Sequence, residues 1–305
     1  MRTFSLNLNW LEAMDFFIIG AQKAASSALQ NMLSRDRRVS LVPGEIGLFE
    51  DPEFEPDLVQ RRLKRWRLAA GKKMLGGKRP NILINPEALE RLVQASPKVR
   101  LLVILRDPVQ RAFSALLHSY RFGGQPIGDP NAELQQWLLN YPRLPRRTYN
   151  LMEHGLYGKH LRRIRETYPE TPLLVIRGES LRKCPAEVAR AVGEFLELPD
   201  LILSTGDRKN VGAKQTRRLR YFRAITRLTY AGPDAYDRLH ARRPQAVFKN
   251  LHRGLAMLDN RIFSRVITGQ GFEFLPETQA ALRRFYAEDQ KALDQFLASG
   301  ECRSV

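Results

Sequence analysis

The sequence predicts an α/β fold in which a central parallel sheet lies between helices, and three observations lead to this prediction. Short apolar runs of the kind that form buried strands recur along the 305 residues, at 16–19, 39–42, 99–105 and 173–176. Helical patterns separate these runs. Polar residues follow several of the strand ends, which is where open α/β sheets bind their ligands. Because no repeat or long linker divides the chain, we expect a single domain over residues 1–305.

The first strand, 16–19, leads through a short loop into a helix. Gly20 ends the strand, and Ser26 and Ser27 open the helix. Backbone N–H groups at a helix N-terminus attract anions, and Lys23 adds a full positive charge in the loop. The pattern predicts a phosphate or sulfate site, although an ordinary strand-turn-helix with a serine N-cap and a surface lysine would read the same way.

A second anion site is predicted after the strand at 99–105. Arg106 follows this strand directly, and Pro108 is well placed in the first turn of the next helix. An arginine can pair with a phosphate through two hydrogen bonds, which a lysine cannot do. Ser114 and His118 lie on one face of the predicted helix. Ser114 can add a hydroxyl to the anion site, whereas a histidine in this position is more often packed than catalytic.

The strand at 39–42 ends at Pro43 and Gly44, and Glu45 follows. Glu45 is in the right place for chemistry if this strand lies beside the first one. Otherwise it is a solvated loop glutamate.

Positive charge dominates the composition, with 50 Lys and Arg against 32 Asp and Glu and a formal net charge of +18. This balance favours anionic partners such as a nucleotide, an anionic glycan or a nucleic acid. Residues 60–79 contain nine basic residues and no acidic one. We expect a basic helix here, with Gly76 and Gly77 ending the segment. It is either a solvated face or a grip on an anionic acceptor.

The remaining predicted elements are an edge strand over 3–10, a helical stretch over 148–168, a helix over 186–197, a basic loop over 208–218 and a final helix over 276–297.

Several classes of protein are disfavoured. Cys184 and Cys302 lie far apart without metal-like spacing, and no acidic pair suggests a metal site. No apolar run approaches the ~18 residues of a membrane span. Glu12 and Asp15 interrupt any signal-peptide core, so a cytoplasmic protein is the expectation.

Both anion motifs resemble those of one known family. Residues 17–29, Phe-Ile-Ile-Gly-Ala-Gln-Lys-Ala-Ala-Ser-Ser-Ala-Leu, look like the 5′-phosphosulfate loop of sulfotransferases that use 3′-phosphoadenosine 5′-phosphosulfate (PAPS). Residues 105–114, Leu-Arg-Asp-Pro-Val-Gln-Arg-Ala-Phe-Ser, resemble their 3′-phosphate motif almost letter for letter. Weaker similarities at 155–157, 179–181, 195–198 and the final helix extend the resemblance over nearly the whole chain. It is closest to the glycan-type and bacterial members.

The resemblance implies a three-layer P-loop-like fold and a reaction. A sulfuryl group would move from PAPS to a hydroxyl (or amine) of a glycan or small-molecule acceptor, leaving adenosine 3′,5′-bisphosphate (PAP) and using no metal. It also implies site residues. The 5′-phosphosulfate would be bound by Gln22, Lys23, Ala24, Ala25, Ser26 and Ser27, with Lys23 stabilising the leaving phosphate. The 3′-phosphate would be bound by Arg106 and Ser114, and weaker candidates for a loop over the nucleotide are Lys214 and Arg217. The catalytic residues would be Lys23, the general base Glu45, and Lys78 of a Lys-x-Pro segment beside the acceptor.

The sequence departs from the family pattern on the acceptor side. The usual glycine-threonine of the phosphosulfate loop is Ala25-Ser26, and the lysine before the base is Gly44. A residue after the base that is often histidine is Gly47. These departures leave His118, His154 or His160 as alternative bases, and a non-catalytic PAPS-binding fold as an alternative function.

Two further alternatives come from other classes. A P-loop kinase-like phosphotransferase would share the architecture, but the sequence lacks G-x-x-x-x-G-K-[ST] and an obvious magnesium aspartate. A nucleic-acid-binding protein would explain the charge of +18. However, the basic residues form no helix-turn-helix, zinc-finger or aromatic RNA-binding pattern.

Overall fold

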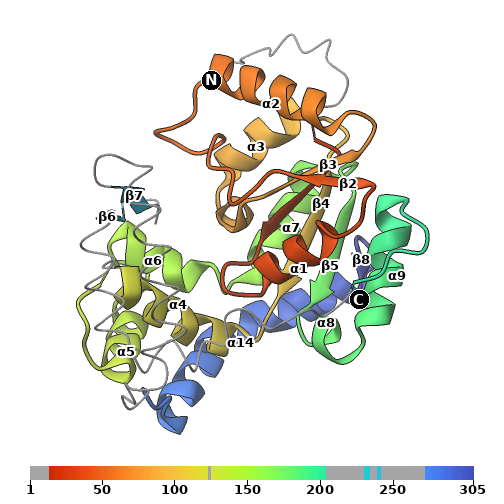
Figure 1. The fold of residues 1–305 in the computed structure, drawn as a ribbon. Coiled ribbons are helices and arrows are strands. Elements are labelled where there is room, and N and C mark those ends of the chain that lie inside the picture. Colours follow the sequence, from red (N-terminus) through yellow and green to blue (C-terminus); the bar gives the residue numbers. More distant parts are fainter. Residues whose placement is uncertain (1–13, 123–124, 204–229, 234–238, 242–271) are drawn as a thin grey trace, which may run out of the picture. The chain divides into compact units, whose positions relative to one another are not determined.

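The computed structural model describes residues 14–122, 125–203, 230–233, 239–241 and 272–305 (Figure 1). The predicted strand at 3–10 and the basic loop at 208–218, with Lys214 and Arg217, lie outside the described residues. The chain divides into two compact units. The first comprises Met1–Asp107, Leu156–Gly206 and Glu288–Val305, and the second comprises Pro108–Gly155 and Asp207–Ala287.

The first unit contains a six-stranded sheet in the order β2-β3-β1-β4-β5-β8, in which every neighbouring pair is parallel. The predicted central parallel sheet is confirmed. Its strands are β1 (Phe16–Gly20), β2 (Val39–Leu41), β3 (Met74–Lys78), β4 (Arg100–Leu105), β5 (Leu173–Arg177) and β8 (Arg303–Ser304).

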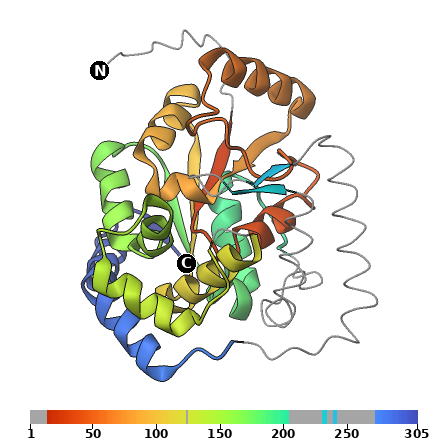
Figure 2. The same ribbon diagram turned by 90° about the vertical axis from the view of Figure 1, so that its left-hand side faces the viewer.

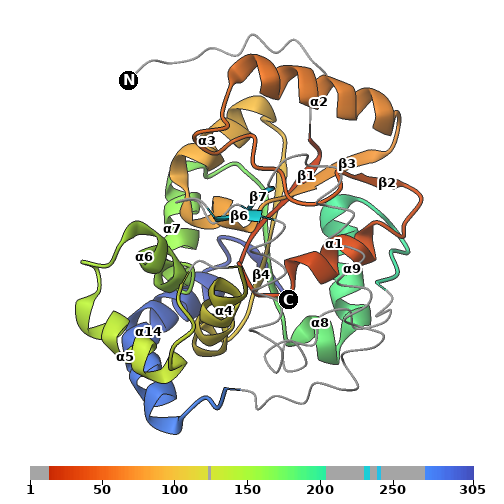
Figure 3. The same cartoon turned by 60° about the vertical axis from the view of Figure 1, so that its left-hand side comes forward.

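Helices cover both faces of this sheet. Figure 3 shows α1 and α9 on one face and α3 and α7 on the other, and Figure 2 shows the same layers from another side. The predicted three-layer arrangement is therefore present in the first unit. Its helices are α1 (Ser26–Leu33), α2 (Pro56–Ala70), the 3₁₀ helix η1 (Pro80–Ile84), α3 (Pro86–Ala95), α7 (Tyr157–Thr167), α8 (Ser180–Lys183), α9 (Pro185–Leu196) and the C-terminal part of α14 (Pro276–Ala298).

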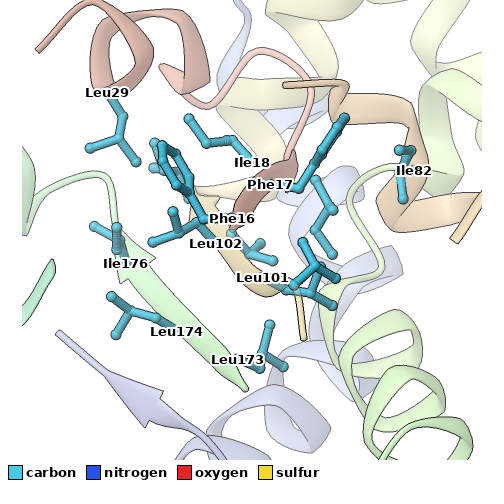
Figure 4. Close-up of a cluster of buried hydrophobic side chains, with 14 of the residues drawn as sticks. Phe16, Phe17, Ile18, Leu29, Ile82, Leu101, Leu102, Leu173, Leu174 and Ile176 are labelled. Carbon is cyan, nitrogen blue, oxygen red and sulfur yellow. The ribbon is translucent and has the colours of Figure 1, made fainter. Parts of the chain in front are cut away.

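The sheet is held by a continuous apolar core (Figure 4). Side chains of β1 pack with those of β4 and β5, and all of Phe16, Ile18, Leu101 and Leu102 are fully buried. Burying one such side chain stabilises a fold by roughly 1.5–3 kcal/mol. The core thus fixes the strand ends, from which the loops carrying the polar residues begin.

Strand β3 was not predicted. The sequence analysis placed a segment end at Gly76 and Gly77, but both glycines lie inside β3 and pair with β1. A Cβ atom on Gly76 would lie 2.1 Å from Cζ of Phe16, and one on Gly77 would lie 2.6 Å from Cε2 of Phe17. Glycine is needed here because aromatic rings of the neighbouring strand occupy the space of a side chain, and not because the chain turns.

Strand β2 does not lie beside β1 as the sequence analysis required for Glu45, because β3 is inserted between them. The loop after β2 is nevertheless joined to β3. Val42 N donates to Gly76 O (3.0 Å) and Ile46 N donates to Lys78 O (2.9 Å). Glu45 therefore reaches the carboxyl end of the sheet through β3.

The second unit contains helices and a two-stranded antiparallel sheet. Its elements are α4 (Pro108–Phe122), α5 (Pro130–Asn140), α6 (Arg146–Glu153), β6 (Tyr230–Pro233), β7 (Leu239–Ala241) and the N-terminal part of α14. The helical stretch predicted over 148–168 is two helices, α6 and α7. Gly155, a poor helix former, lies between them, and Tyr286 Cε1 lies 2.7 Å from where its Cβ would be.

In the part of the chain that the structure describes, no helix combines the length and the apolar character that crossing a membrane requires. The cytoplasmic location stays a prediction of the sequence.

Candidate functional site

The loop between β1 and α1 adopts an unusual backbone. Lys23 has φ 63° and Ala25 has φ 74°, in the left-handed region that favours glycine. Each such residue costs roughly 1–2 kcal/mol, and strain of this kind concentrates at functional sites. Ala21 N donates to Ile104 O at 2.7 Å, which ties the loop to β4. The loop is therefore held in one shape by the neighbouring strand.

The N-cap of α1 is Ala25, with no side-chain capping bond, so the serine N-cap of the alternative interpretation is not formed. Ser26 is buried and Ser27 is exposed. The Ser27 hydroxyl is directed to another element and accepts a hydrogen bond from Lys78, as described next.

Lys78 brings together three of the predicted site residues. It ends β3, and its side chain is only 4% exposed. Its Nζ donates to Ser27 Oγ at 2.8 Å and to Glu45 Oε1 at 3.2 Å. A single buried ammonium group therefore links the start of α1 to the loop that follows β2.

The loop that carries Glu45 is held by hydrogen bonds from a side chain of α1. Gln30 Nε2 donates to the carbonyl oxygens of Val42 (3.1 Å) and Gly44 (3.0 Å). Gly44 has φ +78°, a left-handed conformation that glycine adopts without steric cost. The Glu45 side chain itself is 42% exposed, so it is open to an incoming group.

Two residues of the site, Arg79 and Glu50, escaped the sequence analysis. Arg79 Nε and Nη2 donate to the two carboxylate oxygens of Glu50 at 2.9 and 2.6 Å. Its remaining nitrogen, Nη1, donates to Glu45 Oε2 at 2.9 Å. Burial by itself would lower the pKa of Arg79, but hydrogen bonds and charge from Glu50 and Glu45 raise it above its ordinary value. The only sequence signal was the position of Arg79 inside the Lys-x-Pro segment.

Arg106 brings the two predicted anion motifs together in the first unit. It is exposed at the end of β4, and its Nη1 donates to the backbone oxygen of Lys23 at 3.3 Å. The neighbouring Gly178 N donates to Leu105 O at 2.7 Å, which connects the ends of β4 and β5. The cationic ends of Lys23 and Arg106 thus come from adjoining loops at the carboxyl edge of the sheet.

Ser114 and His118 are half-buried on α4, in the second unit. Of the other candidate bases, His154 is 2% exposed and His160 is 1% exposed. Burial makes both poor groups for taking a proton from a molecule that arrives from solvent. Glu45 is the better candidate because it is exposed.

Arg111, three residues before Ser114 on α4, is fully buried. Its Nη2 donates to the backbone oxygen of Leu151 and lies 3.4 Å from Tyr286 Oη. These contacts join α4, α6 and α14 within the second unit, which gives Arg111 a packing role.

The described geometry combines a strained loop at a helix N-terminus, nearby cations and one exposed carboxylate between Lys78 and Arg79. Such an arrangement can bind an anion and take a proton from a neighbouring group.

Comparison with known proteins agrees with this reading. Residues 53–201 match the model of a protein family described as "Sulfotransferase family". The match includes Lys78, Arg106 and Ser114 but begins after the 20–25 loop and Glu45.

Two curated relatives carry heparan sulfate in their names. The chain is 26% identical over 201 residues to the bifunctional heparan sulfate N-deacetylase/N-sulfotransferase 1 of Caenorhabditis briggsae, covering 63% of this chain and 23% of that protein. It is 29% identical over 185 residues to the mouse heparan sulfate glucosamine 3-O-sulfotransferase 3B1, covering 61% of this chain and 46% of that protein. The chain therefore spans less than two thirds of the length of these relatives.

Among solved structures, the sulfotransferase of Alicyclobacillus acidocaldarius superimposes with a TM-score of 0.54. It is 23% identical and covers 70% of this chain and 92% of its own. This likeness confirms the predicted P-loop-like fold. The family match, these relatives and this fold support the prediction of a sulfotransferase.

Proposed function

We propose that the protein transfers a sulfuryl group from PAPS to a hydroxyl (or amine) of an acceptor. The observation that carries the proposal is the buried ammonium of Lys78, which hydrogen-bonds Ser27 of the predicted donor loop and Glu45, the predicted base. Donor and acceptor must lie together for the transfer, and this contact links the residues assigned to each.

On the donor side, the proposal relies on charge and on the helix N-terminus. Lys23 and the first-turn N–H groups of α1 suit a 5′-phosphosulfate. Arg106, whose contact to the Lys23 backbone joins the two motifs, suits a phosphate through its planar guanidinium. The 5′-phosphosulfate residues proposed from the resemblance are Gln22, Lys23, Ala24, Ala25, Ser26 and Ser27, and those for the 3′-phosphate are Arg106 and Ser114. Lys214 and Arg217 stay predictions outside the described residues.

On the acceptor side, Glu45 would take the proton of the acceptor hydroxyl while the oxygen of that hydroxyl forms a bond to the sulfur of PAPS. PAPS supplies the sulfuryl group, and the electron pair of the broken sulfur–oxygen bond stays on the phosphate oxygen of the product PAP. Lys23 and Lys78 would stabilise the charge that develops there. General base catalysis typically contributes ~10²–10⁴-fold, and positioning with electrostatic stabilisation supplies most of the rest. Every step uses residues of this chain and needs no metal.

We further propose an anionic glycan as the acceptor class. The relatives' names refer to heparan sulfate, and the net charge of this chain is +18. Within α2, the exposed Arg61, Arg62, Lys64 and Arg65 offer a basic surface. A small-molecule acceptor is the alternative from the sequence, and the same residues would serve its transfer chemistry.

The test is transfer of radioactive sulfate from ³⁵S-labelled PAPS to heparan sulfate, desulfated heparin and 4-nitrophenol. Labelled glycan, absent when Lys23 is replaced by Met, would support the proposal with its glycan acceptor. Label on 4-nitrophenol alone would support the transfer and contradict the glycan. A third outcome is that the folded protein labels no acceptor and consumes ATP–magnesium instead. This result would contradict sulfuryl transfer and favour a phosphotransferase.

A further inference from the structure

Among the described residues, Arg79 and Glu50 form a buried ion pair at the site, and the proposed function leaves the role of this pair open. The side chain of Arg79 is 8% exposed and that of Glu50 is 1% exposed. Both oxygens of Glu50 accept from Arg79, in the planar two-bond geometry that only arginine offers. Glu50 therefore fixes the plane of the guanidinium.

Stability alone does not explain this pair. Moving two charges out of water is costly, and apolar residues of similar size are often as stable as a buried ion pair. If the pair served only to stabilise the core, Arg79 would need no hydrogen-bond partner other than Glu50. Arg79 instead directs its third nitrogen to Glu45, a residue that is 42% exposed.

We propose that Arg79 is a positioning residue that holds the carboxylate of Glu45 in the orientation for proton abstraction, with Glu50 as its buried anchor. This inference rests on the proposed function. The backbone of the Glu45 loop is already held by Gln30 and by β3, so the contact from Arg79 would act on the side chain of Glu45.

The backbone around Arg79 is suited to this role. Arg79 N donates to Ile18 O in the central strand β1 at 3.0 Å, and the loop of Glu45 is bonded to the preceding residue through Ile46 N. The chain then enters η1 at Pro80. The guanidinium therefore projects from a fixed point of the sheet.

Lys78 and Arg79 each contact a different oxygen of the Glu45 carboxylate. Lys78 Nζ contacts Oε1 and Arg79 Nη1 contacts Oε2. Each carboxylate oxygen has about two lone-pair sites, so one site on each oxygen stays available for an acceptor proton. Removing Arg79 would leave the carboxylate free to rotate about its contact with Lys78.

The experiment is a double-mutant cycle on turnover, using ³⁵S-labelled PAPS and the acceptors named above. The pair is replaced by apolar residues of similar size, Arg79→Met with Glu50→Leu, which removes the contact to Glu45 without leaving a buried unpaired charge. Turnover should fall by about 10²-fold, the scale of a misplaced catalytic group. With Glu45→Gln already present, the same replacement should lower turnover by no more than about threefold, since there is no base left to position.

PAP affinity and the melting temperature separate positioning from folding, and both should be nearly unchanged by the replacement. Arg91→Met is the matched control. It removes an arginine that contacts Asp51 at 2.9 Å and Phe49 O at 3.0 Å, and turnover should stay near that of the original protein. If the double replacement does not fold, Arg79→Lys, which keeps the charge but loses the planar fork, should show the same dependence on Glu45.

Equal losses of turnover with and without Glu45 would overturn the positioning role while leaving the proposed function intact. Absence of transfer by the original protein would overturn the proposed function, and this role of Arg79 with it.

Discussion

The proposed donor side and the proposed acceptor side of the candidate site differ in how closely they follow the sulfotransferase motifs that the sequence resembles. The proposed donor side consists of the 20–25 loop and Arg106. Ala25 and Ser26 stand where the motif usually has glycine and threonine, and Ala25 has a positive φ. The proposed acceptor side consists of Glu45, Glu50, Lys78 and Arg79, and Gly44 stands where the resemblance implies a lysine before the proposed base. In its place, Arg79 and Lys78 contact the two oxygens of Glu45. The proposed donor side therefore depends on the backbone at a helix N-terminus, whereas the carboxylate of Glu45 is oriented by side-chain cations.

Both sides depend on the sheet, so the largest expected effect comes from its interior. Gly76→Val would place side-chain atoms where the ring of Phe16 already lies, with the Cβ position 2.1 Å from Cζ. We expect a loss of at least about 3 kcal/mol in the free energy of unfolding, at the upper end for overpacking. Urea denaturation measures this. The control Met74→Val, half-buried in the same strand, should cost less than about 1.5 kcal/mol, and a stable Gly76→Val protein would contradict the assignment of β3.

Glu45→Gln separates the acceptor side from the donor side. The amide keeps the shape but cannot take a proton, so turnover should fall by about 10²–10⁴-fold while PAP affinity changes little. Steady-state kinetics with labelled PAPS, alongside calorimetry with PAP, checks both. The exposed Glu170→Gln provides the control and should behave like the original protein. Normal turnover of Glu45→Gln would mean that another group is the base.

Arg106→Ala tests the donor side, because it should lower the affinity for PAP, which Glu45→Gln should leave nearly unchanged. Loss of a hydrogen bond to a charged phosphate costs about 1.5–3 kcal/mol, so PAP should bind roughly 10–100-fold more weakly. AMP, which has no 3′-phosphate, should bind with unchanged affinity. The exposed Arg190→Ala on α9 is the control, and an equal loss of affinity for AMP and PAP would argue against the 3′-phosphate assignment.

The smallest effect is expected from relieving strain in the loop. Ala25 has φ 74°, so Ala25→Gly should raise the free energy of unfolding by roughly 1 kcal/mol or less, after the entropy cost of glycine is subtracted. Thermal denaturation can measure this. Ala28→Gly, inside α1, should instead destabilise by roughly 0.5–1 kcal/mol. The strain assignment fails if both substitutions destabilise equally.

Sequence reasoning found those parts of the fold in which one local pattern dominates. The strands β1, β4 and β5 are apolar except at their ends, and Pro108 and Pro276 mark the starts of α4 and α14. Such patterns reflect burial on both faces of a parallel sheet.

The parts that sequence reasoning missed depend on contacts between distant segments. Strand β3 contains Gly76 and Gly77 because rings of β1 fill the space beside them, and glycine in isolation suggests a turn. Arg79 pairs with Glu50, which lies 29 positions earlier in the chain, and with Glu45, which lies 34 positions earlier. No local sequence pattern reveals contacts over such separations. The parts of the site that follow a local motif could therefore be predicted. The contacts of Glu45 could not, because they depend on β3 lying between β1 and β2.

Calorimetric titration with PAP, beside AMP and ATP–magnesium, tests the proposed PAPS-dependent sulfuryl transfer most directly. We expect PAP to bind at least about tenfold more tightly than either of the others, a difference of roughly 1.4 kcal/mol. Tighter binding of ATP–magnesium would contradict the claim and favour a phosphotransferase. No measurable binding of any of the three would contradict a functional donor site.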